Sequence, residues 1–300
     1  MKILLTGSGG FTGTFFRNFL TKKKVDFFTL GIKDSRNESH FKISPNFRLE
    51  EIKAVILNVL PDYIFHLAGS PKKSSKNSLM DLNFKFAKNI ILSAKSLNKE
   101  VNIILIGSAA EYGNIMQDDL PIKETFIPKP HTPYGEAKLK QTEFALENHA
   151  QNCNILILRP FNLFGPGMPK FLALGNFANQ IIEFKKSFDN SKKHILKTGN
   201  LDVTRDYIFI KDFIEIMWLL SQKKKNYGKI FNVCSGESKN IREILNKMIS
   251  NSGLKIDLIQ EVSKLKKNDI KNHYGCNKKM ISSLGGYDFT NFEDSLKSLI

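Results

Sequence analysis

A tyrosine and a lysine four residues apart, Tyr134 and Lys138, have the types and spacing needed to move a proton. They follow Pro133, a residue typical of the first turn of a helix, and helical residues four apart lie on one face. A free tyrosine has a pKa near ~10, too high for proton exchange at neutral pH. A neighbouring ammonium favours the phenolate, so we expect Lys138 to lower the pKa of Tyr134 and make it a usable acid/base group.

Ser108 is the third residue suited to this chemistry. It follows an apolar run, residues 101–106, that predicts a buried parallel strand. A serine there can hydrogen-bond the same carbonyl or alcohol oxygen as Tyr134, while Lys138 can also hold a ribose hydroxyl of a cofactor. The pair Tyr134 and Lys138 alone is common in helices; it becomes specific in combination with Ser108 and a glycine-rich loop at the start of the chain.

That loop predicts a phosphate-binding site. A strand beginning at Ile3 runs into a glycine-rich segment, and a helix is predicted over residues 15–24. Glycine permits positive φ and a close approach of the backbone to a ligand, and the first amides of the helix face the phosphates. The strand–loop–helix context of the spacing Gly-x-x-Gly-x-x-Gly indicates a dinucleotide. The residues expected at the cofactor are Gly7, Gly9, Gly10, Phe11, Thr12 and Gly13.

The choice of dinucleotide depends on the end of the second predicted strand, residues 25–32. An acid there selects NAD, whereas a cation accommodates the 2′-phosphate of NADP. Gly31 stands where the acid normally falls, so we favour NADP (NADPH), with Lys33 and Arg36 as candidate phosphate partners. Asp34 could instead bind the ribose 2′-hydroxyl of NAD, so NAD is kept as the alternative cofactor. A second alternative is that residues 33–36 form a solvated polar turn that contacts no ligand.

Strands and helices alternate through the first half of the chain. Helices are predicted over 50–60 and 79–97, and an apolar strand over 63–68, with His66 as a packed core histidine. This order predicts an α/β fold with a Rossmann-type, doubly wound parallel sheet, and ligands bind beyond the carboxyl ends of its strands. Leu67, Ala68 and Gly69 should therefore lie near the cofactor. In the C-terminal third we expect helices over 171–184, 211–222 and 292–300 and strands over 194–197 and 207–210.

Composition narrows the function classes. The formal charge is +16, but the lysines are scattered and no aromatic-interleaved basic stripe appears, which favours an anionic small substrate over nucleic acid. The three cysteines fit no metal or redox spacing, so we expect no metal. Gly7 to Gly13 interrupt the first apolar run, and no stretch approaches the ~20 apolar residues of a membrane span. We expect a cytoplasmic protein without a membrane partner.

These motifs resemble the extended short-chain dehydrogenase/reductase family of NAD(P)-dependent nucleotide-sugar epimerases, dehydratases and reductases. The resemblance continues through residues 159–167, 205–212 and 232–236. It implies a dinucleotide-binding Rossmann domain, residues 1–160, that includes Pro160 at the cofactor. It also implies a smaller α/β domain, residues 161–300, that binds a nucleotide-diphospho-sugar, with segments around 201–235 returning to the first domain. A homodimer is expected from the same resemblance.

Within the family, residues 199–207, 216–222 and 275–279 look like the branch that acts on GDP-mannose derivatives, the 4,6-dehydratases and 4-ketoreductases. Arg205 offers a planar fork of donors to a diphosphate, and a surface salt bridge with Asp202 or Asp206 is the alternative. The substrate residues that the resemblance implies are Ser108, Ala109, Asn162, Asn179, Lys197 and Arg205.

Departures from the family pattern favour one reaction. The dehydratases carry an Asp-Glu pair where this chain has Ala109 and Ala110, and alanine transfers no proton; Glu111 is expected to be structural or solvated. Residues 160–180 hold no histidine, unlike the enzymes that epimerise C3 and C5. We expect a 4-ketoreductase of a nucleotide-diphospho-4-keto-6-deoxy sugar, GDP-linked, in deoxysugar biosynthesis. A C4 epimerase or 4-dehydrogenase with tightly bound NAD and a catalytically silent binding protein are the alternatives.

Overall fold

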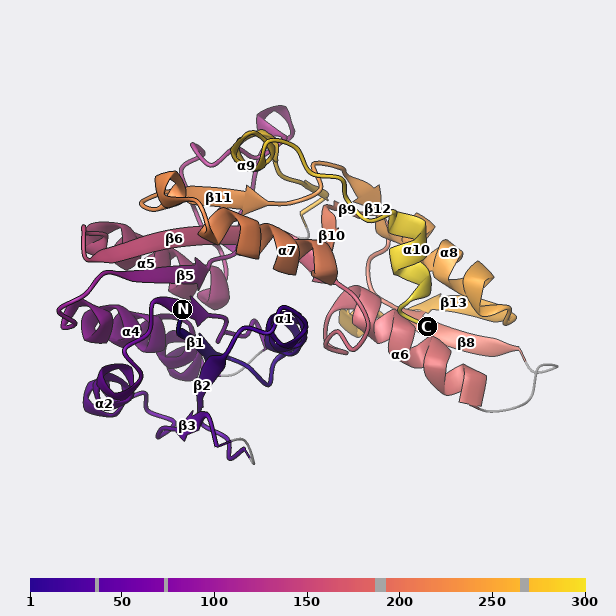
Figure 1. Ribbon diagram of the computed structural model, residues 1–300. Helices are drawn as coiled ribbons and strands as arrows, with labels where there is room; N and C mark the ends of the chain where they lie inside the picture. Colours follow the sequence, from indigo (N-terminus) through magenta and orange to yellow (C-terminus); the bar gives the residue numbers. More distant parts are fainter. Residues whose placement is uncertain (36–37, 73–74, 187–192, 265–269) are drawn as a thin grey trace.

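A seven-stranded parallel sheet forms the core of the larger lobe in the computed structural model (Figure 1). The structure describes residues 1–35, 38–72, 75–186, 193–264 and 270–300. The strand order β11-β6-β5-β4-β1-β2-β3, with every neighbouring pair parallel, is the predicted Rossmann-type arrangement. The strands are β1 (Ile3–Thr6), β2 (Phe27–Gly31), β3 (His40–Lys42), β4 (Tyr63–His66), β5 (Val101–Ile106), β6 (Cys153–Pro160) and β11 (Ile230–Val233).

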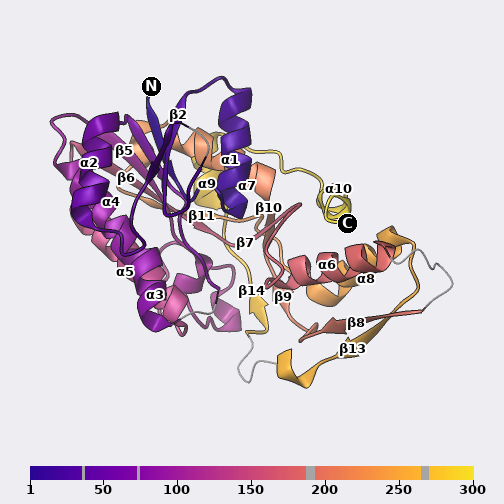
Figure 2. The same cartoon turned by 90° about the horizontal axis from the view of Figure 1, so that it is seen from below.

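Helices cover both faces of this sheet (Figure 2). Successive side chains of a strand point to opposite faces, so Ile3 and Leu5 pack on one side and Leu4 on the other. Helices α1 (Phe11–Lys22) and α7 (Ile210–Ser221) contact each other on the first face. Helices α2 (Leu49–Val59), α4 (Phe86–Lys95) and α5 (Pro133–Asn148) cover the second. Trp218 on α7 packs against Phe65.

One long predicted helix has a different internal structure. The stretch 79–97 consists of α3 (Lys76–Met80), a π-helical turn (Asp81–Lys85) and α4. A π-helical turn shifts the hydrogen-bond pattern of the helix by one residue. The buried side chain of Asn83 donates to the carbonyl of Leu79 at 3.0 Å and accepts from the amide of Ser70 at 3.0 Å. Asn83 therefore has a structural role, joining the helix to the segment before it.

A smaller lobe follows the sheet in the chain (Figure 1). Strand β8 (His194–Thr198) pairs in parallel with β13 (Ile256–Gln260), next to α6 (Ala173–Lys186), α8 (Ile241–Ser252) and α10 (Phe292–Lys297). Strands β9 (Thr204–Arg205), β12 (Lys239–Asn240) and β14 (Asn272–His273) form a second small sheet. Strands β7 (Asn162–Phe164) and β10 (Tyr207–Phe209) form a separate parallel pair.

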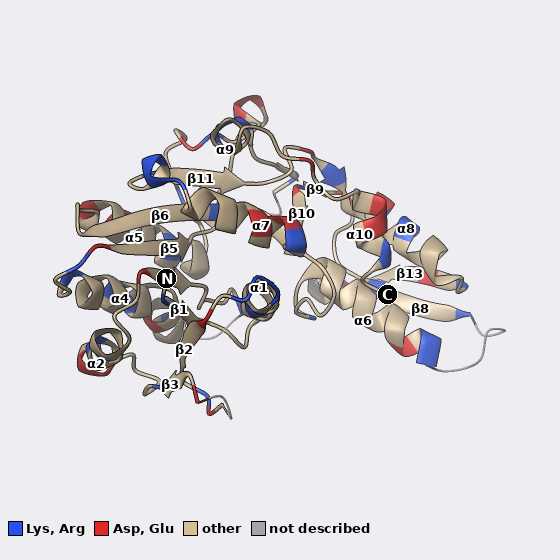
Figure 3. Cartoon of the chain, in the orientation of Figure 1, with Lys and Arg blue, Asp and Glu red and all other residues tan. Residues whose placement is uncertain are grey.

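Several boundaries differ from the sequence-based expectation. The first helix begins at Phe11 and not at residue 15, because Gly10 takes an extended conformation and serves as its N-cap. Strand β3 and helix α9 (Lys278–Leu284) are short elements that no apolar pattern predicts. Basic residues lie on many elements of both lobes (Figure 3). Within the described ranges, no helix is long and apolar enough to cross a membrane, and no cluster of three metal-ligating side chains occurs.

Candidate active site

The glycine-rich loop is packed so closely that side chains would not fit at two positions. Gly7 has φ +69°, and a Cβ there would lie 2.6 Å from the amide nitrogen of Ala68. A Cβ at Gly13 would lie 2.1 Å from the carbonyl oxygen of Gly7. At Gly9 a Cβ would meet nothing within 4 Å, so this additional glycine is not required by packing.

The loop leaves the first backbone N–H groups of α1 able to bind a ligand. The carbonyl of Gly7 accepts a 3.0 Å hydrogen bond from Gly10, the N-cap residue. The amides of Phe11, Thr12 and Gly13 then fall in the first turn, where a helix has no internal acceptor for its N–H groups. Together with the positive end of the helix dipole, these residues fit the pyrophosphate of a dinucleotide.

Strands β1 and β4 are joined by a buried side-chain pair beneath this loop. The hydroxyl of Thr6 lies 2.9 Å from Nδ1 of His66 and accepts from the amide of Ala68 at 3.3 Å. Burial lowers the pKa of His66 to about 3, so it is the neutral core histidine that we expected. This pair fixes the start of the segment 67–69. A Cβ on Gly69 would lie 3.0 Å from Nζ of Lys138, so the segment lies against helix α5.

An ion pair lies at the end of β2, and one of its members, Lys42, was not among the residues expected near the cofactor. Asp34 pairs with Lys42 of β3 at 2.9 Å, and Lys42 lowers the pKa of Asp34. The backbone carbonyl of Lys33 accepts from Nε2 of His40 at 2.8 Å, and the Lys33 side chain is exposed. The other candidate cation, Arg36, lies outside the described residues. Lys42 could not be found from the sequence because β3, which places it there, was not predicted.

Helix α5 brings Tyr134 and Lys138 to the end of β5. Its N-cap residue Thr132 accepts a hydrogen bond from Gly135 at 3.1 Å, and Pro133 follows, as predicted. The Tyr134 side chain lies near enough to Ser108 for the serine to lower the pKa of Tyr134. A Cβ on Gly135 would lie 2.5 Å from the carbonyl oxygen of Ala110, so α5 packs directly against the turn that carries Ser108.

The protonation states differ from our expectation. Burial raises the pKa of Tyr134 to about 12, and the nearby Ser108 only partly opposes this rise. The prediction that the pKa of Tyr134 lies below its usual value is therefore wrong, because the effect of burial exceeds any effect of the Lys138 ammonium. The Lys138 ammonium donates to the carbonyl of Ile106 at 2.7 Å and to Gln141 at 3.1 Å. Burial lowers its own pKa to about 8. At neutral pH, Tyr134 is a neutral phenol that can donate a proton.

A buried ion pair underlies the Ser108 turn. The carboxylate of Glu111 accepts a 2.8 Å hydrogen bond from the amide of Ser108, and it pairs with Nη2 of Arg159 at 2.7 Å. Burial raises the pKa of Glu111, and the Arg159 guanidinium opposes that rise. Glu111 is thus structural and not solvated. The capping-box spacing of Ser108 and Glu111 is a sequence signal that could have predicted the first of these contacts.

The predicted substrate residues divide between two regions. Ala109 is buried next to Ser108, and Pro160 is buried at the end of β6. Asn162 on β7 donates from its amide to the carbonyl of Asp206 at 2.8 Å. Asn179 on α6 and Lys197 on β8 lie in the smaller lobe (Figure 1), where Lys197 pairs with Glu261 at 3.1 Å.

Arg205 is held by backbone carbonyls. Its Nη1 donates to Thr204 and to Ile270, each at 2.7 Å. The two carboxylates considered as its alternative partners have other contacts. Asp202 pairs with Arg242 at 2.8 Å, and Asp206 accepts hydrogen bonds from the amide and hydroxyl of Ser235, each at 2.8 Å.

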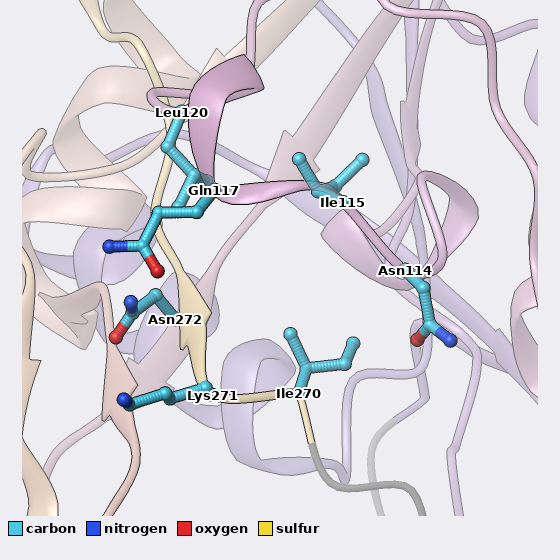
Figure 4. Close-up of a pocket in the computed structure, with 7 residues that line it drawn as sticks. All are labelled: Asn114, Ile115, Gln117, Leu120, Ile270, Lys271 and Asn272. Atoms are coloured by element: carbon cyan, nitrogen blue, oxygen red, sulfur yellow. The ribbon is translucent and has the colours of Figure 1, made fainter.

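A cavity of about 380 Å³ adjoins this region (Figure 4). Its walls come from the loop that follows the Ser108 turn and from the segment that Arg205 contacts at Ile270. No sequence pattern indicates this cavity, because its two walls are far apart in the chain. Amide and apolar side chains and one lysine line it: Asn114, Ile115, Gln117, Leu120, Ile270, Lys271 and Asn272.

The Rossmann-type sheet, the glycine loop and the Ser108–Tyr134–Lys138 group define a nicotinamide-dependent enzyme of the extended short-chain dehydrogenase/reductase type. The sequence profile of the NAD dependent epimerase/dehydratase family matches residues 3–234, and the chain belongs to this family. The expected family and fold class are therefore confirmed.

Two curated relatives and one solved structure are similar over most of the chain. GDP-6-deoxy-D-mannose reductase of Pseudomonas aeruginosa is 26% identical over 247 residues, 80% of each chain. GDP-6-deoxy-D-talose 4-dehydrogenase of Aggregatibacter actinomycetemcomitans is 26% identical over 305 residues, 100% of this chain and 97% of the relative. The structure of RMD from Pseudomonas aeruginosa complexed with NADPH has a TM-score of 0.85 at 22% identity and covers 99% of this chain and 97% of its own.

Proposed function

We propose that the chain modifies a nucleotide sugar, as an NADPH-dependent 4-ketoreductase of a GDP-linked 4-keto-6-deoxy sugar. The observation that carries the reaction type is the turn at residues 108–111. It presents Ser108 to a neutral Tyr134, while its one carboxylate, Glu111, is buried against Arg159. Such a site can exchange a proton with one substrate oxygen, but Ala109 and Ala110 cannot assist the loss of water. The names of the two curated relatives support a GDP-linked 6-deoxysugar.

The residues of the chain act on the oxygen of the sugar carbonyl. The nicotinamide, when bound, supplies the hydride to C4. Ser108 donates a hydrogen bond to the C4 oxygen, and Tyr134 gives that oxygen its phenolic proton. As the proton leaves, negative charge develops on the tyrosine oxygen. The buried ammonium of Lys138, one helical turn away, stabilises that charge.

The structure fits a dinucleotide, and two features support the choice of NADPH. Gly31 ends β2 without an acid, and the nearby carboxylate of Asp34 is paired with Lys42. The exposed ammonium of Lys33 is then available to a 2′-phosphate. A contact between Arg36 and the 2′-phosphate stays a prediction from the sequence.

On the substrate side we propose that Arg205 and Asn162 bind the diphosphate region, with Asn179 and Lys197 further along the smaller lobe. Arg205 also supports one wall of the 380 Å³ cavity through its bond to Ile270. The amides of Asn114, Gln117 and Asn272 in that cavity offer both donors and acceptors.

The deciding experiment is the consumption of NADPH with GDP-4-keto-6-deoxymannose generated in situ, with NADH in a parallel reaction. Consumption of NADPH that is faster than that of NADH would support both the reductase and the cofactor proposals. No consumption of either cofactor would refute this substrate.

The reverse reaction is the second candidate, because the relative that covers the whole chain is named a 4-dehydrogenase. In that direction Tyr134 would have to accept a proton, which its raised pKa disfavours at neutral pH. Oxidation of a GDP-6-deoxyhexose with NAD or NADP, run beside the reduction, distinguishes the two. Bound NAD in the purified protein would favour the epimerase or dehydrogenase alternatives.

A further inference from the structure

Glu111 and Arg159 form a fully buried pair directly behind the Ser108 turn. The exposed fractions of their side chains are 0% and 2%. Each carboxylate oxygen of Glu111 has a separate task. Oε1 accepts from the amide of Ser108 at 2.8 Å, whereas Oε2 accepts from Nε of Arg159 at 2.8 Å and from Nη2 at 2.7 Å. Both arginine nitrogens thus converge on one carboxylate oxygen, which leaves Oε1 to the Ser108 amide.

The surrounding packing leaves this carboxylate little freedom. A Cβ on Gly107 would lie 2.5 Å from Oε1 of Glu111, so the strand exit lies against the carboxylate. The Arg159 guanidinium lies over the ring of Tyr112 at 4.7 Å, and the Tyr112 hydroxyl donates to Asn232 at 2.7 Å. The pair is thereby tied to β6 and, through Asn232, to β11.

The same turn also fixes the side chain of Ser108. Its Oγ accepts a 3.1 Å hydrogen bond from the amide of Ala110, which closes the capping box with Glu111. This bond holds the Ser108 oxygen at the turn and leaves its hydroxyl hydrogen unused by the turn, so the serine can donate it to the reacting oxygen. Orientation of this kind contributes to rate because the group needs no reorganisation during the reaction.

We propose that Glu111, held by Arg159, is a positioning residue: it fixes the Ser108 backbone and so directs the Ser108 hydroxyl at the substrate oxygen. This inference rests on the proposed function. Stability alone does not require two buried charges here, because apolar residues of similar volume often replace such a pair without lowering the stability of the fold. A positioning role predicts instead a loss of turnover when the bond to Ser108 is removed.

A matched pair of variants isolates that bond. Arg159→Met is combined with Glu111→Gln in one protein and with Glu111→Leu in the other. Neither protein carries a buried charge at this site, but only the glutamine offers an oxygen to the Ser108 amide. We expect kcat of the glutamine variant to exceed that of the leucine variant by about 10-fold or more, since small misplacements of reacting groups cost rate. KM should agree within about twofold, because ground-state binding is unchanged.

Hydrogen exchange of the Ser108 amide gives a second readout that does not need turnover. Exchange should be faster in the leucine variant than in the glutamine variant, with NADPH titration and thermal melting as folding controls. Glu111→Asp with Arg159 intact keeps the charge pair with a shorter reach, and it should lower kcat with little change in KM. Equal kcat and equal exchange in the matched pair would overturn the inference. If the unmodified protein reduces no keto sugar, the proposed function fails instead, and the exchange comparison still decides the role of Glu111.

Discussion

The ammonium of Lys138 donates a 2.7 Å hydrogen bond to the carbonyl of Ile106, the last residue of β5. The helix that carries Tyr134 is thereby tied to the strand that leads into Ser108. A buried charge–carbonyl bond of this kind is stronger than a neutral one. The distance between the tyrosine and the serine is therefore fixed from both sides, by Lys138 and by the packing of Gly135 on Ala110.

Replacement of the proton donor should abolish most of the activity. Tyr134→Phe should lower kcat for keto-sugar reduction by about 10²-fold or more, since it removes general acid catalysis. NADPH binding, measured by titration, should be retained. Tyr227→Phe is the matched control: its hydroxyl donates to the Ser221 carbonyl at 2.8 Å, between the end of α7 and the chain before β11. It should lower stability by about 1 kcal/mol and leave kcat unchanged. Near-normal turnover by Tyr134→Phe would contradict the mechanism.

Activity should fall on the alkaline side as Lys138 loses its proton. Burial lowers the pKa of Lys138 to about 8, and a lysine is charged below its pKa. The phenol of Tyr134, with a pKa of about 12, stays protonated through this range. The rate of reduction should thus be flat below about pH 8 and decline above it. A pH profile of kcat that rises through this range would assign the ionisation to another group.

Cofactor preference should depend on Lys33. In the proposed cofactor site, Lys33→Glu would place a carboxylate beside the adenosine ribose, where it would repel a 2′-phosphate and favour a 2′-hydroxyl. We expect KM for NADPH to increase by about tenfold, a ΔΔG of about 1.4 kcal/mol, with little change for NADH. Lys23→Glu, on a residue that caps the C-terminal end of α1, makes the same charge change away from the loop and serves as the control. Equal effects of the two variants on both cofactors would refute a specific contact.

His66 should make the fold sensitive to acid. Its pKa is about 3 in the folded protein, against 6.5 for a free histidine. The unfolded chain therefore binds a proton that the folded chain refuses, and stability falls as the pH decreases from about 6.5 toward 3. Between about pH 7 and about pH 5 this loss is about 2 kcal/mol. Urea unfolding of His66→Gln should show a smaller loss over that interval. Thr6→Val, which keeps the histidine, should retain the full loss.

The sequence predicted the sheet because its signals are local. Apolar runs such as residues 101–106 mark buried parallel strands, and the glycine spacing marks the loop. Short elements without an apolar pattern, such as β3, escaped prediction. So did the π-helical turn around Asn83, because it depends on a bond to Ser70 and not on periodicity.

The proximity of the candidate residues was predictable, but their electrostatics were not. Tyr134 and Lys138 share a helix face, so their proximity follows from spacing alone. The pKa of Tyr134 depends on how deeply the folded chain buries it, and no spacing contains that information. Arg159 could not be assigned to Glu111 for a similar reason: 48 residues separate them, and only the pairing of β5 with β6 brings them together.

Strand β11 forms one edge of the central sheet although it lies beyond β8 and β9 of the smaller lobe in the chain. The polypeptide therefore leaves the sheet after β6 and comes back to it before the end. Suppose that the segment after residue 160 is replaced by that of a relative, with a single crossover at this point. Strand β6 would then lose β11, the strand that it pairs with in this chain. A chimera designed to take the sugar preference of a relative therefore needs at least two further junctions, one before α7 and one after β11. The central sheet then retains its own edge strand.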